Sequence, residues 1–221
     1  MAALTKFASV TAAGFLVLAA AGGASAQTPA AGNAAPAETG ALSEMVLGDE
    51  NAPVTVIEYA SLTCSHCAHW HEEIFPTVNE NYIKTGKVRF ILREMPVIPG
   101  HPALVARSYA GAMLARCAAD TGGADSYFAM MDTLFETQEI WAFGDDARAE
   151  LLKTAAAAGI DEPTFDACLQ RADLKAHIDG NIEVATDEYE IQGTPGFIIN
   201  GNYERFEAFE DIFKALDKAA E

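Results

Sequence analysis

The sequence predicts an α/β fold that is interrupted by an all-helical subdomain. Residues 53–61, PVTVIEYAS, are nearly continuously apolar and rich in β-branched side chains, as expected of a strand buried on both faces. Residues 87–95, KVRFILREM, form a second strand-like run, and the segment between the two runs has helical spacing. This order predicts a βαβ unit. Residues 100–176 contain no convincing strand, so we expect them to form an inserted set of helices.

The connecting helix of the βαβ unit is expected to begin at Ser65. Its apolar and aromatic positions recur every three or four residues, at Cys67, Trp70, Ile74, Val78 and Tyr82. Pro76 lies inside this pattern and should kink the helix, because proline has no backbone N–H to donate. Gly86 is expected to end it.

The insertion opens with two predicted helices. The first has Pro102 in its first turn, and its apolar stripe comprises Leu104, Val105, Tyr109, Ala112, Met113 and Cys117. It should stop near Asp120-Thr121-Gly122. This triplet also occurs in aspartic proteases, but it stands alone at a helix end, so we interpret it as a helix stop. The second helix is expected over 127–135.

Three further helices complete the predicted helical region. Asp145 is the expected N-cap of the first of them, and Gly159 should close it. Asp161 is the expected N-cap of the next, with Pro163 in its first turn. The last is expected over residues 175–190.

The C-terminal segment returns to strands. GTPGFIIN, residues 193–200, contains a predicted strand, and Gly-Asn at 201–202 is expected to form a hairpin turn. YERF, residues 203–206, would be a short partner strand. An amphipathic helix is expected from Glu207 to Ala219.

The first 26 residues have the features of a secretory signal peptide. Lys6 supplies a positive charge, a short apolar stretch follows, and Ala24-Ser25-Ala26 offers small residues for cleavage. The apolar stretch is too short and too rich in alanine to span a bilayer well, so we expect no membrane insertion. Residues 27–43 are mainly Ala, Pro, Gly and Thr and are expected to be a flexible linker. The folded domain would then cover residues 44–221 of a protein exported to the periplasm.

The charge of the chain excludes two classes of partner. The 221 residues carry a formal net charge of −18. A strongly acidic protein is a poor ligand for nucleic acid and for anionic lipid.

Four cysteines in an exported chain usually form disulfides. Three pairings are possible. Cys64 and Cys67 lie close together at the junction of strand and helix, whereas Cys117 and Cys168 are far apart in the insertion. A Cys64–Cys67 bond would leave Cys117 to pair with Cys168, and two buried free thiols are the alternative.

The Cys64–Cys67 dyad is placed for thiol chemistry. A cysteine reacts as its thiolate, and Cys64 would lie at a helix N-terminus, where free N–H groups and the helix dipole favour an anion. His66 adds a positive or hydrogen-bonding group nearby. A stabilised thiolate makes the disulfide easier to reduce and the protein a stronger oxidant. Cys67, one turn further along, suits the resolving role.

A metal site is the alternative interpretation of the dyad. Cys64, Cys67 and His71 share one face of the predicted helix, so they could converge on an ion. A closed zinc site needs four ligands, and the other cysteines lie far away. We therefore expect neither a metal nor a cofactor, and we expect His69 and His71 to be solvated or partly packed at the surface.

Three features occur in the order found in one known family. EYASLTCSHC at 58–67, a long kinked helix with a helical insertion after it, and GTPGFIING at 193–201 resemble the DsbA-like thiol–disulfide oxidoreductases of the thioredoxin superfamily. The pair Cys117 and Cys168 resembles the α-proteobacterial DsbA type, whose insertion carries a second disulfide. The resemblance implies a thioredoxin fold with an inserted all-helical subdomain, at about residues 100–176.

The resemblance also implies roles for the residues of the dyad and its loop. Cys64 would be the nucleophile and Cys67 its partner, with Ser65 and His66 tuning Cys64. Thr194 and Pro195 would form a cis-proline loop that presents the Thr194 backbone to an extended substrate, as in strand addition.

Further roles follow from the same resemblance. Glu58 would be a buried acid that moves protons during exchange, because burial raises the pKa of a carboxyl group; a solvent-facing glutamate at a sheet edge is the alternative. Cys117 and Cys168 would form a structural disulfide. Trp141 and Phe143, between helices, are expected in the core of the insertion, and lining a groove over the dyad is their alternative.

The predicted function is donation of disulfides to reduced exported polypeptides through the dyad. A membrane-bound redox partner, implied by the resemblance, would reoxidise the protein. The first alternative is a disulfide isomerase or reductase, since Thr194 before the proline also occurs in such relatives. The second is a periplasmic copper or zinc binder that uses the reduced dyad.

Overall fold

The computed structural model describes residues 40–221 of the chain. The expected signal peptide, 1–26, and the expected linker up to residue 39 lie outside the described residues. Residues 40–43, also expected in the linker, are part of the folded unit. Gly40–Leu42 form a 3-10 helix, η1, in which Ala41 is buried. Contacts to the insertion hold this segment, because Asp120 accepts a hydrogen bond from the Ala41 N–H and Arg116 donates one to the Ala41 carbonyl.

A five-stranded mixed sheet forms the centre of the fold. Its strands are β1 (Met45–Leu47), β2 (Val54–Ala60), β3 (Val88–Glu94), β4 (Gly196–Ile199) and β5 (Asn202–Glu204). The spatial order is β1-β3-β2-β4-β5, with β2 and β3 parallel and the other pairs antiparallel. The two central strands and the C-terminal hairpin were predicted, but the hairpin turn lies at 200–201 and not at 201–202, because Ile199 pairs with Asn202. β1 was not predicted, because a three-residue edge strand is too short to show an alternating pattern.

The connection between the central strands is a kinked helix, as predicted. α1 (Ser65–Glu73) is followed by α2 (Phe75–Val78) and by a π-helical turn, η2 (Asn79–Ile83). Pro76 lies in the first turn of α2, where its missing N–H interrupts the hydrogen bonding of a continuous helix. The chain therefore turns at Ile74, and the dyad and the η2 turn lie on different helical segments.

Helices alone connect β3 to β4, as expected. They are α3 (Pro102–Glu136), α4 (Gln138–Trp141), α5 (Ala147–Ala157), α6 (Glu162–Leu169) and α7 (Ala172–Asp187). α3 covers both of the first two predicted helices, and it is interrupted at Gly123, whose φ of 63° is not helical. The stop predicted around Asp120-Thr121-Gly122 is thus a kink between two helical parts.

The first residues of three helices can be compared with their predicted positions. Asp161 caps α6 by accepting a hydrogen bond from the Thr164 N–H, as expected. The N-cap of α5 is Asp146 and not Asp145, because the Asp146 carboxylate reaches the Ala149 N–H. The final helix, α8 (Asp211–Ala219), also begins four residues later than expected.

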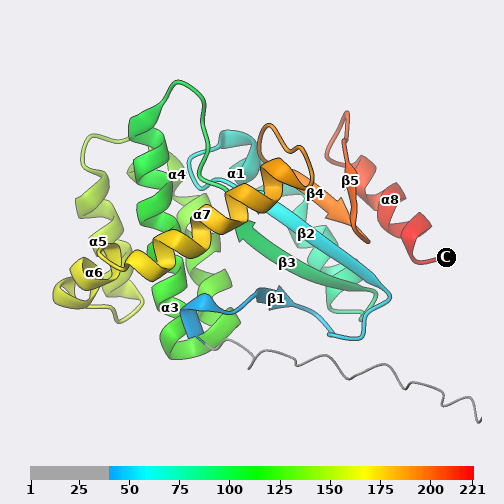
Figure 1. Ribbon diagram of the computed structural model, residues 1–221. Helices are drawn as coiled ribbons and strands as arrows, with labels where there is room; N and C mark the ends of the chain where they lie inside the picture. The colour runs from blue at the N-terminus through cyan, green and yellow to red at the C-terminus, as the bar shows by residue number, and fades with distance from the viewer. Residues whose placement is uncertain (1–39) are drawn as a thin grey trace, which may run out of the picture. The chain divides into compact units, whose positions relative to one another are not determined.

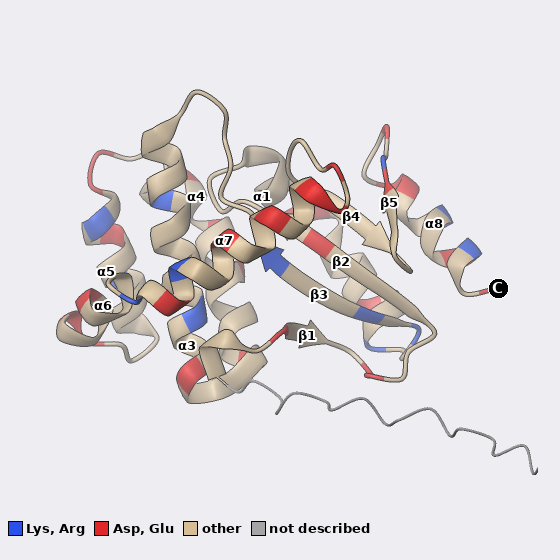
Figure 2. Ribbon diagram, in the orientation of Figure 1, with Lys and Arg blue, Asp and Glu red and all other residues tan. Residues whose placement is uncertain are grey.

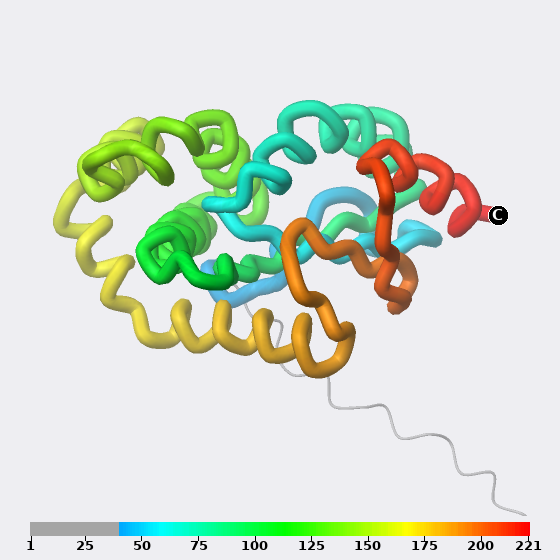
Figure 3. The backbone as a smooth tube through the Cα atoms, turned by 90° about the horizontal axis from the view of Figure 1, so that it is seen from above, coloured from blue at the N-terminus to red at the C-terminus, as the bar shows by residue number. Residues whose placement is uncertain are grey.

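Helices cover both faces of the sheet. α7 crosses one face, while α1, α2, η2 and α8 lie against the other, and α3 to α6 gather to the left of the sheet in Figures 1 and 3. The α7 face has a small core of its own, formed by Tyr59, Met95, Ala185, Ile191 and Ile198. The opposite face belongs to the main core, which continues into the insertion.

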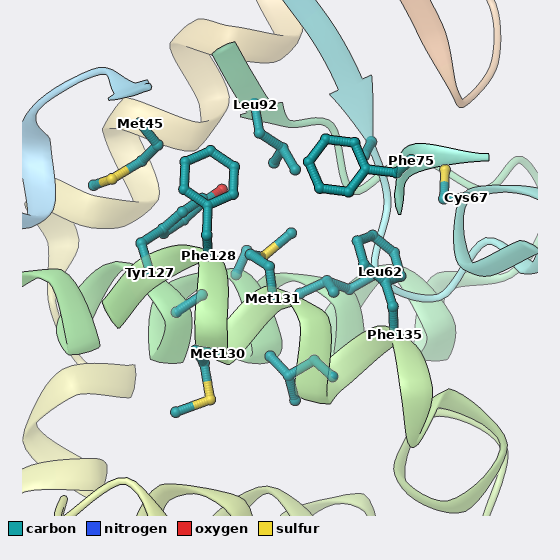
Figure 4. Packing of buried hydrophobic residues seen from close by; sticks show 14 of the residues in the cluster. Met45, Leu62, Cys67, Phe75, Leu92, Tyr127, Phe128, Met130, Met131 and Phe135 are labelled. Atoms are coloured by element: carbon teal, nitrogen blue, oxygen red, sulfur yellow. The ribbon is translucent and has the colours of Figure 1, made fainter. Parts of the chain in front are cut away.

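The main core joins the insertion to the dyad. Figure 4 shows side chains of the second part of α3, such as Met131 and Phe135, facing Leu62, Phe75 and Cys67. Trp141 is buried, and its indole N–H donates to the Leu134 carbonyl at 2.7 Å. Phe143, which was expected beside it in the core, is 42% exposed, so that expectation was wrong. It follows the short helix α4 on a turn that leads away from the core.

The surface carries charge of both signs with an acidic excess. Figure 2 shows Lys and Arg positions scattered among Asp and Glu positions, with no continuous basic stretch on the described chain. Among the described residues, no helix has both the length and the apolar character needed to cross a membrane.

Candidate active site: a dithiol at a helix N-terminus

Cys64 lies where β2 ends and α1 begins. It is the N-cap residue of α1, with extended backbone angles, and its carbonyl accepts hydrogen bonds from the N–H groups of Cys67 and Ala68. Its own N–H donates to the Ser61 carbonyl at 3.0 Å. The short turn between strand and helix thus places the Cys64 sulfur at the positive end of α1.

The insertion holds this turn in place. Gln138 of α4 donates from one amide nitrogen to the carbonyls of Leu62 (2.8 Å) and Cys64 (3.0 Å). On the other side, the Ser108 hydroxyl accepts from the Leu62 N–H at 3.1 Å. Sequence reasoning missed Gln138, which lies 74 residues from Cys64 and belongs to no recognisable motif.

The two thiols of the dyad are free and differ sharply in environment. Cys64 is partly exposed, whereas Cys67 is buried. The hydrogen bond from the Cys67 thiol, aided by the N–H groups of Cys67 and His66, lowers the pKa of Cys64 to about 5 despite partial burial. Burial, together with the neighbouring Cys64 sulfur, holds the pKa of Cys67 well above its usual range. One thiol is therefore a thiolate at neutral pH and the other keeps its proton.

His66 acts on Cys64 through its backbone. Its N–H is among the groups that lower the pKa of Cys64. Its side chain is exposed and lies against Phe209, with 6.5 Å between the ring centroids. The imidazole thus faces the surface beside the dyad.

The Thr194-Pro195 loop lies next to Cys64. The peptide bond before Pro195 is cis. The Cys64 sulfur lies 3.3 Å from the Thr194 carbonyl oxygen, to which it donates a hydrogen bond when it is protonated. β4 begins at Gly196 and pairs with β2, which brings the loop beside the end of β2 that carries Cys64. Both Thr194 and Pro195 are half-buried, so part of each remains open to solvent.

Below the dyad, Glu58 and His71 form a buried pair. Glu58 is fully buried in β2, and its Oε2 lies 3.0 Å from His71 Nε2. His71 was expected at the surface, but its side chain is only 3% exposed. It lies four residues after Cys67 and therefore on the inward face of α1. A polar residue at a core-facing helical position was the signal that could have found it.

The described residues do not gather the ligands that a metal site would need. No group of three or more His, Cys, Asp or Glu side chains in residues 40–221 is arranged to hold an ion. His71, the third ligand of the metal alternative, directs Nε2 to Glu58 instead.

The other two cysteines are bonded to each other. The Cys117–Cys168 disulfide joins α3 to α6 across 51 residues of sequence. Both residues are buried in the insertion, away from the dyad turn.

Comparison with known proteins places the chain in a family. A family model described as thioredoxin matches residues 41–218. The chain belongs to the thioredoxin family. Its inserted helices give it the DsbA-like arrangement, as in the crystal structure of Wolbachia pipientis alpha-DsbA1, which is 27% identical with a TM-score of 0.69 over 80% of this chain and 90% of that one. The predicted thioredoxin fold with an all-helical insertion is therefore confirmed.

Two further proteins are similar over most of the described chain. A Rickettsia prowazekii protein named "Putative protein-disulfide oxidoreductase" is 31% identical over 176 residues, which are 80% of this chain and 61% of that protein. This chain thus spans about three fifths of the length of such curated relatives. BdbD from Bacillus subtilis, in its oxidised crystal structure, shares the fold at 22% identity, with a TM-score of 0.67 over 80% of this chain and 92% of that one.

Proposed function

We propose that this protein is a thiol–disulfide oxidoreductase that donates disulfides to reduced exported polypeptides. The observation that carries the proposal is the asymmetry of the dyad: Cys64 is accessible with a pKa of about 5, and Cys67 is buried with a raised pKa. A thiolate stabilised to this extent favours the reduced dyad, which makes the oxidised dyad a strong acceptor of electrons. The names of the relatives agree with this activity.

The reaction proceeds by two exchanges of disulfide bonds. A substrate thiolate attacks Cys64, forming a mixed disulfide, and the Cys64–Cys67 bond breaks with its electron pair on Cys67. A second substrate thiolate then attacks the substrate sulfur of the mixed disulfide, and Cys64 leaves as the stabilised thiolate. The substrate has lost two electrons, and the dyad, now reduced, needs an outside oxidant.

The substrate would lie across the Thr194-Pro195 loop. The exposed part of Thr194 offers backbone groups to an extended segment whose sulfur lies at Cys64. Pro195 also lines a pocket of about 200 Å³, whose wall includes both aromatic residues, such as Phe209, and the charged residues Glu204 and Arg205. Ile140 and Phe143, the exposed large apolar residues of the described chain, follow Gln138 closely in the sequence. The exposed apolar side chains of Ile140 and Phe143 suit unfolded substrates, which expose apolar side chains of their own.

The place of action and the redox partner are part of the proposal. Residues 1–26 have the pattern of a cleaved signal peptide, which would deliver the protein to the periplasm. A membrane-bound partner would reoxidise the dyad there. Mass spectrometry of the protein recovered from a periplasmic fraction should give an N-terminus just after Ala26, and an uncleaved chain would contradict export by this route.

The redox potential separates an oxidase from an isomerase or reductase. Equilibration of the dyad with glutathione mixtures should give a potential above about −180 mV, toward the range of strong oxidants near −120 mV. A value near −270 mV, typical of a reductase, would overturn the proposed direction.

The pH dependence of Cys64 tests the observation on which the proposal rests. Alkylation of the reduced protein should label Cys64 first, at a rate that is level above pH 6 and falls about tenfold per pH unit below the pKa of about 5.

The lowered pKa of Cys64 also makes the reduced fold more stable than it would be with an ordinary thiol. Because the folded pKa is lowered, this contribution is complete above the unfolded pKa and is lost as the pH falls through about 5. A midpoint near 8.5 would contradict the mechanism.

A further inference from the structure

Disulfide exchange places a charge on a buried sulfur. When a substrate thiolate attacks Cys64, the Cys64–Cys67 bond breaks with its electron pair on Cys67. Cys67 has no solvent exposure, so bulk water does not stabilise the charge on its sulfur. Burial also raises the pKa of Cys67, because it disfavours the charged form. A hydrogen-bond donor at this sulfur would therefore speed the exchange, and this requirement rests on the proposed function.

The backbone N–H of Ser61 is a donor at this position. Ser61 follows β2 and is fully buried, so its N–H needs a partner. The Ala60 carbonyl accepts from the Met95 N–H at 2.7 Å, which directs the backbone groups of Ala60 toward β3 and those of Ser61 toward β4. β4 pairs with β2 only as far as Tyr59, so Ser61 lies beyond the end of that ladder. The Cys67 sulfur takes the place of a strand partner, because the Ser61 N–H hydrogen-bonds it and opposes the larger effect of burial on its pKa.

Ser108 of α3 holds the peptide group that follows Ser61. The Ser108 hydroxyl accepts from the Leu62 N–H at 3.1 Å, and it lies 3.1 Å from the Ser61 hydroxyl, with which it shares a hydrogen bond. The turn is closed by the Cys64 N–H, which donates to the Ser61 carbonyl at 3.0 Å. Both serines are buried, so water does not compete for these bonds. The orientation of Ser61 thus depends on a side chain 47 residues further along the chain.

We propose that the Ser61 N–H stabilises the negative charge on the Cys67 sulfur during exchange, and that Ser108 is the residue that positions this N–H. In the transition state the charge lies on the outer two of three sulfurs, and Cys67 is an outer sulfur whether the dyad opens or closes. In the end states Cys67 carries no charge, because it is either in the disulfide or protonated. The N–H therefore lowers the barrier in both directions and leaves the equilibrium between the oxidised dyad and the mixed disulfide unchanged.

Thr63 offers a matched comparison within the same turn. Its hydroxyl donates to the Leu104 carbonyl at 3.1 Å, so Thr63 also ties the dyad turn to α3. Thr63 is buried, as Ser108 is, but its hydrogen bond involves neither Ser61 nor the Leu62 N–H. Thr63→Val and Ser108→Ala each remove one hydroxyl that links the turn to the insertion, and only the second releases the peptide group next to Ser61.

Exchange with glutathione measures both directions of this step. Rapid mixing, acid quenching and mass spectrometry give the rate at which reduced glutathione opens the oxidised dyad to the Cys64 mixed disulfide, and the rate at which Cys67 closes it again. Loss of a positioned donor to a developing anion costs about 10²–10³ in rate, so in Ser108→Ala, which loosens the N–H without removing it, we expect both rates to fall by the same factor of about ten. The ratio of the two rates and the redox potential should stay at the wild-type values. Thr63→Val should leave both rates unchanged.

A second variant separates positioning from folding. Ser61→Ala removes the hydroxyl contact from the other side, so it keeps the test decisive if Ser108→Ala does not fold. It should also slow both rates, and the double variant should be no slower than Ser108→Ala alone, because the two hydroxyls act through one contact. Wild-type rates in both single variants, a change in one direction only, or an equal loss in Thr63→Val would overturn the role of Ser108 and leave the oxidoreductase intact. A wild-type protein that forms no Cys64–Cys67 bond would overturn both.

Discussion

Two buried glutamates lie on adjacent parallel strands, and they differ in the number and the chemical nature of their hydrogen-bond partners. Glu94, at the end of β3, accepts hydrogen bonds from the Tyr127 hydroxyl (2.6 Å), from Arg116 (2.8 Å) and from the Asn181 amide (3.1 Å). Both carboxylate oxygens have partners, and these come from α3 and α7. The carboxylate therefore ties β3 to α3 of the insertion and to α7, which crosses the sheet.

Glu58, on the neighbouring strand β2, has one partner. Its Oε2 contacts His71, and its Oε1 has none in the described chain. Glu94 is paired with a guanidinium, which stays charged at any accessible pH. Glu58 is paired with an imidazole, which exists in a neutral and a protonated form. The comparison indicates that the Glu94–Arg116 pair, whose charge is fixed, stabilises the fold. The Glu58–His71 pair can exchange protons and is therefore available for chemistry.

Removing the charge of Glu94 should have the largest effect. Glu94→Gln leaves the guanidinium of Arg116 buried without a counter-charge, and we expect a loss of about 3–5 kcal/mol in the free energy of unfolding. Urea unfolding of the oxidised protein measures it. Glu44→Gln is the matched control, because Glu44 pairs with Arg93 at the surface and should cost at most about 1 kcal/mol. Equal losses of unfolding free energy in both variants would contradict the special structural role that we assign to Glu94.

The disulfide lies next to this structural cluster, since Cys117 follows Arg116 on α3. Replacing Cys117 and Cys168 by serine opens a loop of 51 residues, which should lower the free energy of unfolding by about 4 kcal/mol. Disulfide transfer to a reduced substrate should stay within a few-fold, because the pair lies away from the dyad turn. A collapse of turnover in a variant that remains folded would assign the pair to the chemistry.

Gln138→Ala should have an intermediate effect. It removes the donor from the Leu62 and Cys64 carbonyls, and the unsatisfied buried carbonyl should cost about 1–3 kcal/mol. Gln170 offers a control, because its amide also bonds a carbonyl but is exposed. Gln170→Ala should change the unfolding free energy by less than about 0.5 kcal/mol. A similar loss at both positions would mean that the turn does not depend on Gln138.

The smallest effect on stability is expected for Glu58→Gln. The amide can keep a hydrogen bond to His71, and no permanently charged partner is left behind, so the unfolding free energy should stay within about 1 kcal/mol of wild type. Formation of the Cys64–Cys67 bond should nevertheless slow, because Glu58 acts on the Cys67 thiol. A loss comparable to that of Glu94→Gln would show that the two carboxyls do the same structural work.

Local patterns in the sequence predicted most of the fold. β2, β3, the kink at Pro76 and the cap at Asp161 each depend on residues close together in the chain. The misses have a common cause. The burial of His71 depends on Phe135 of α3, and the role of Gln138 depends on a carbonyl 76 residues away. Exposure of Phe143 likewise follows from how the turn after α4 leaves the core, which no local pattern records.

The contacts that complete the dyad come from late in the chain. The Thr194 carbonyl is 130 residues beyond Cys64, and Gln138, which donates to the Cys64 carbonyl, is 74 residues beyond it. A ribosome makes the chain from its N-terminus, so Cys64 and Cys67 are exposed to solvent long before either contact exists. Until residue 138 has emerged, the turn that carries Cys64 lacks the side chain that holds its carbonyls. Cys117 is synthesised within that interval, and the nascent protein therefore holds three unprotected thiols before its own oxidant site is assembled.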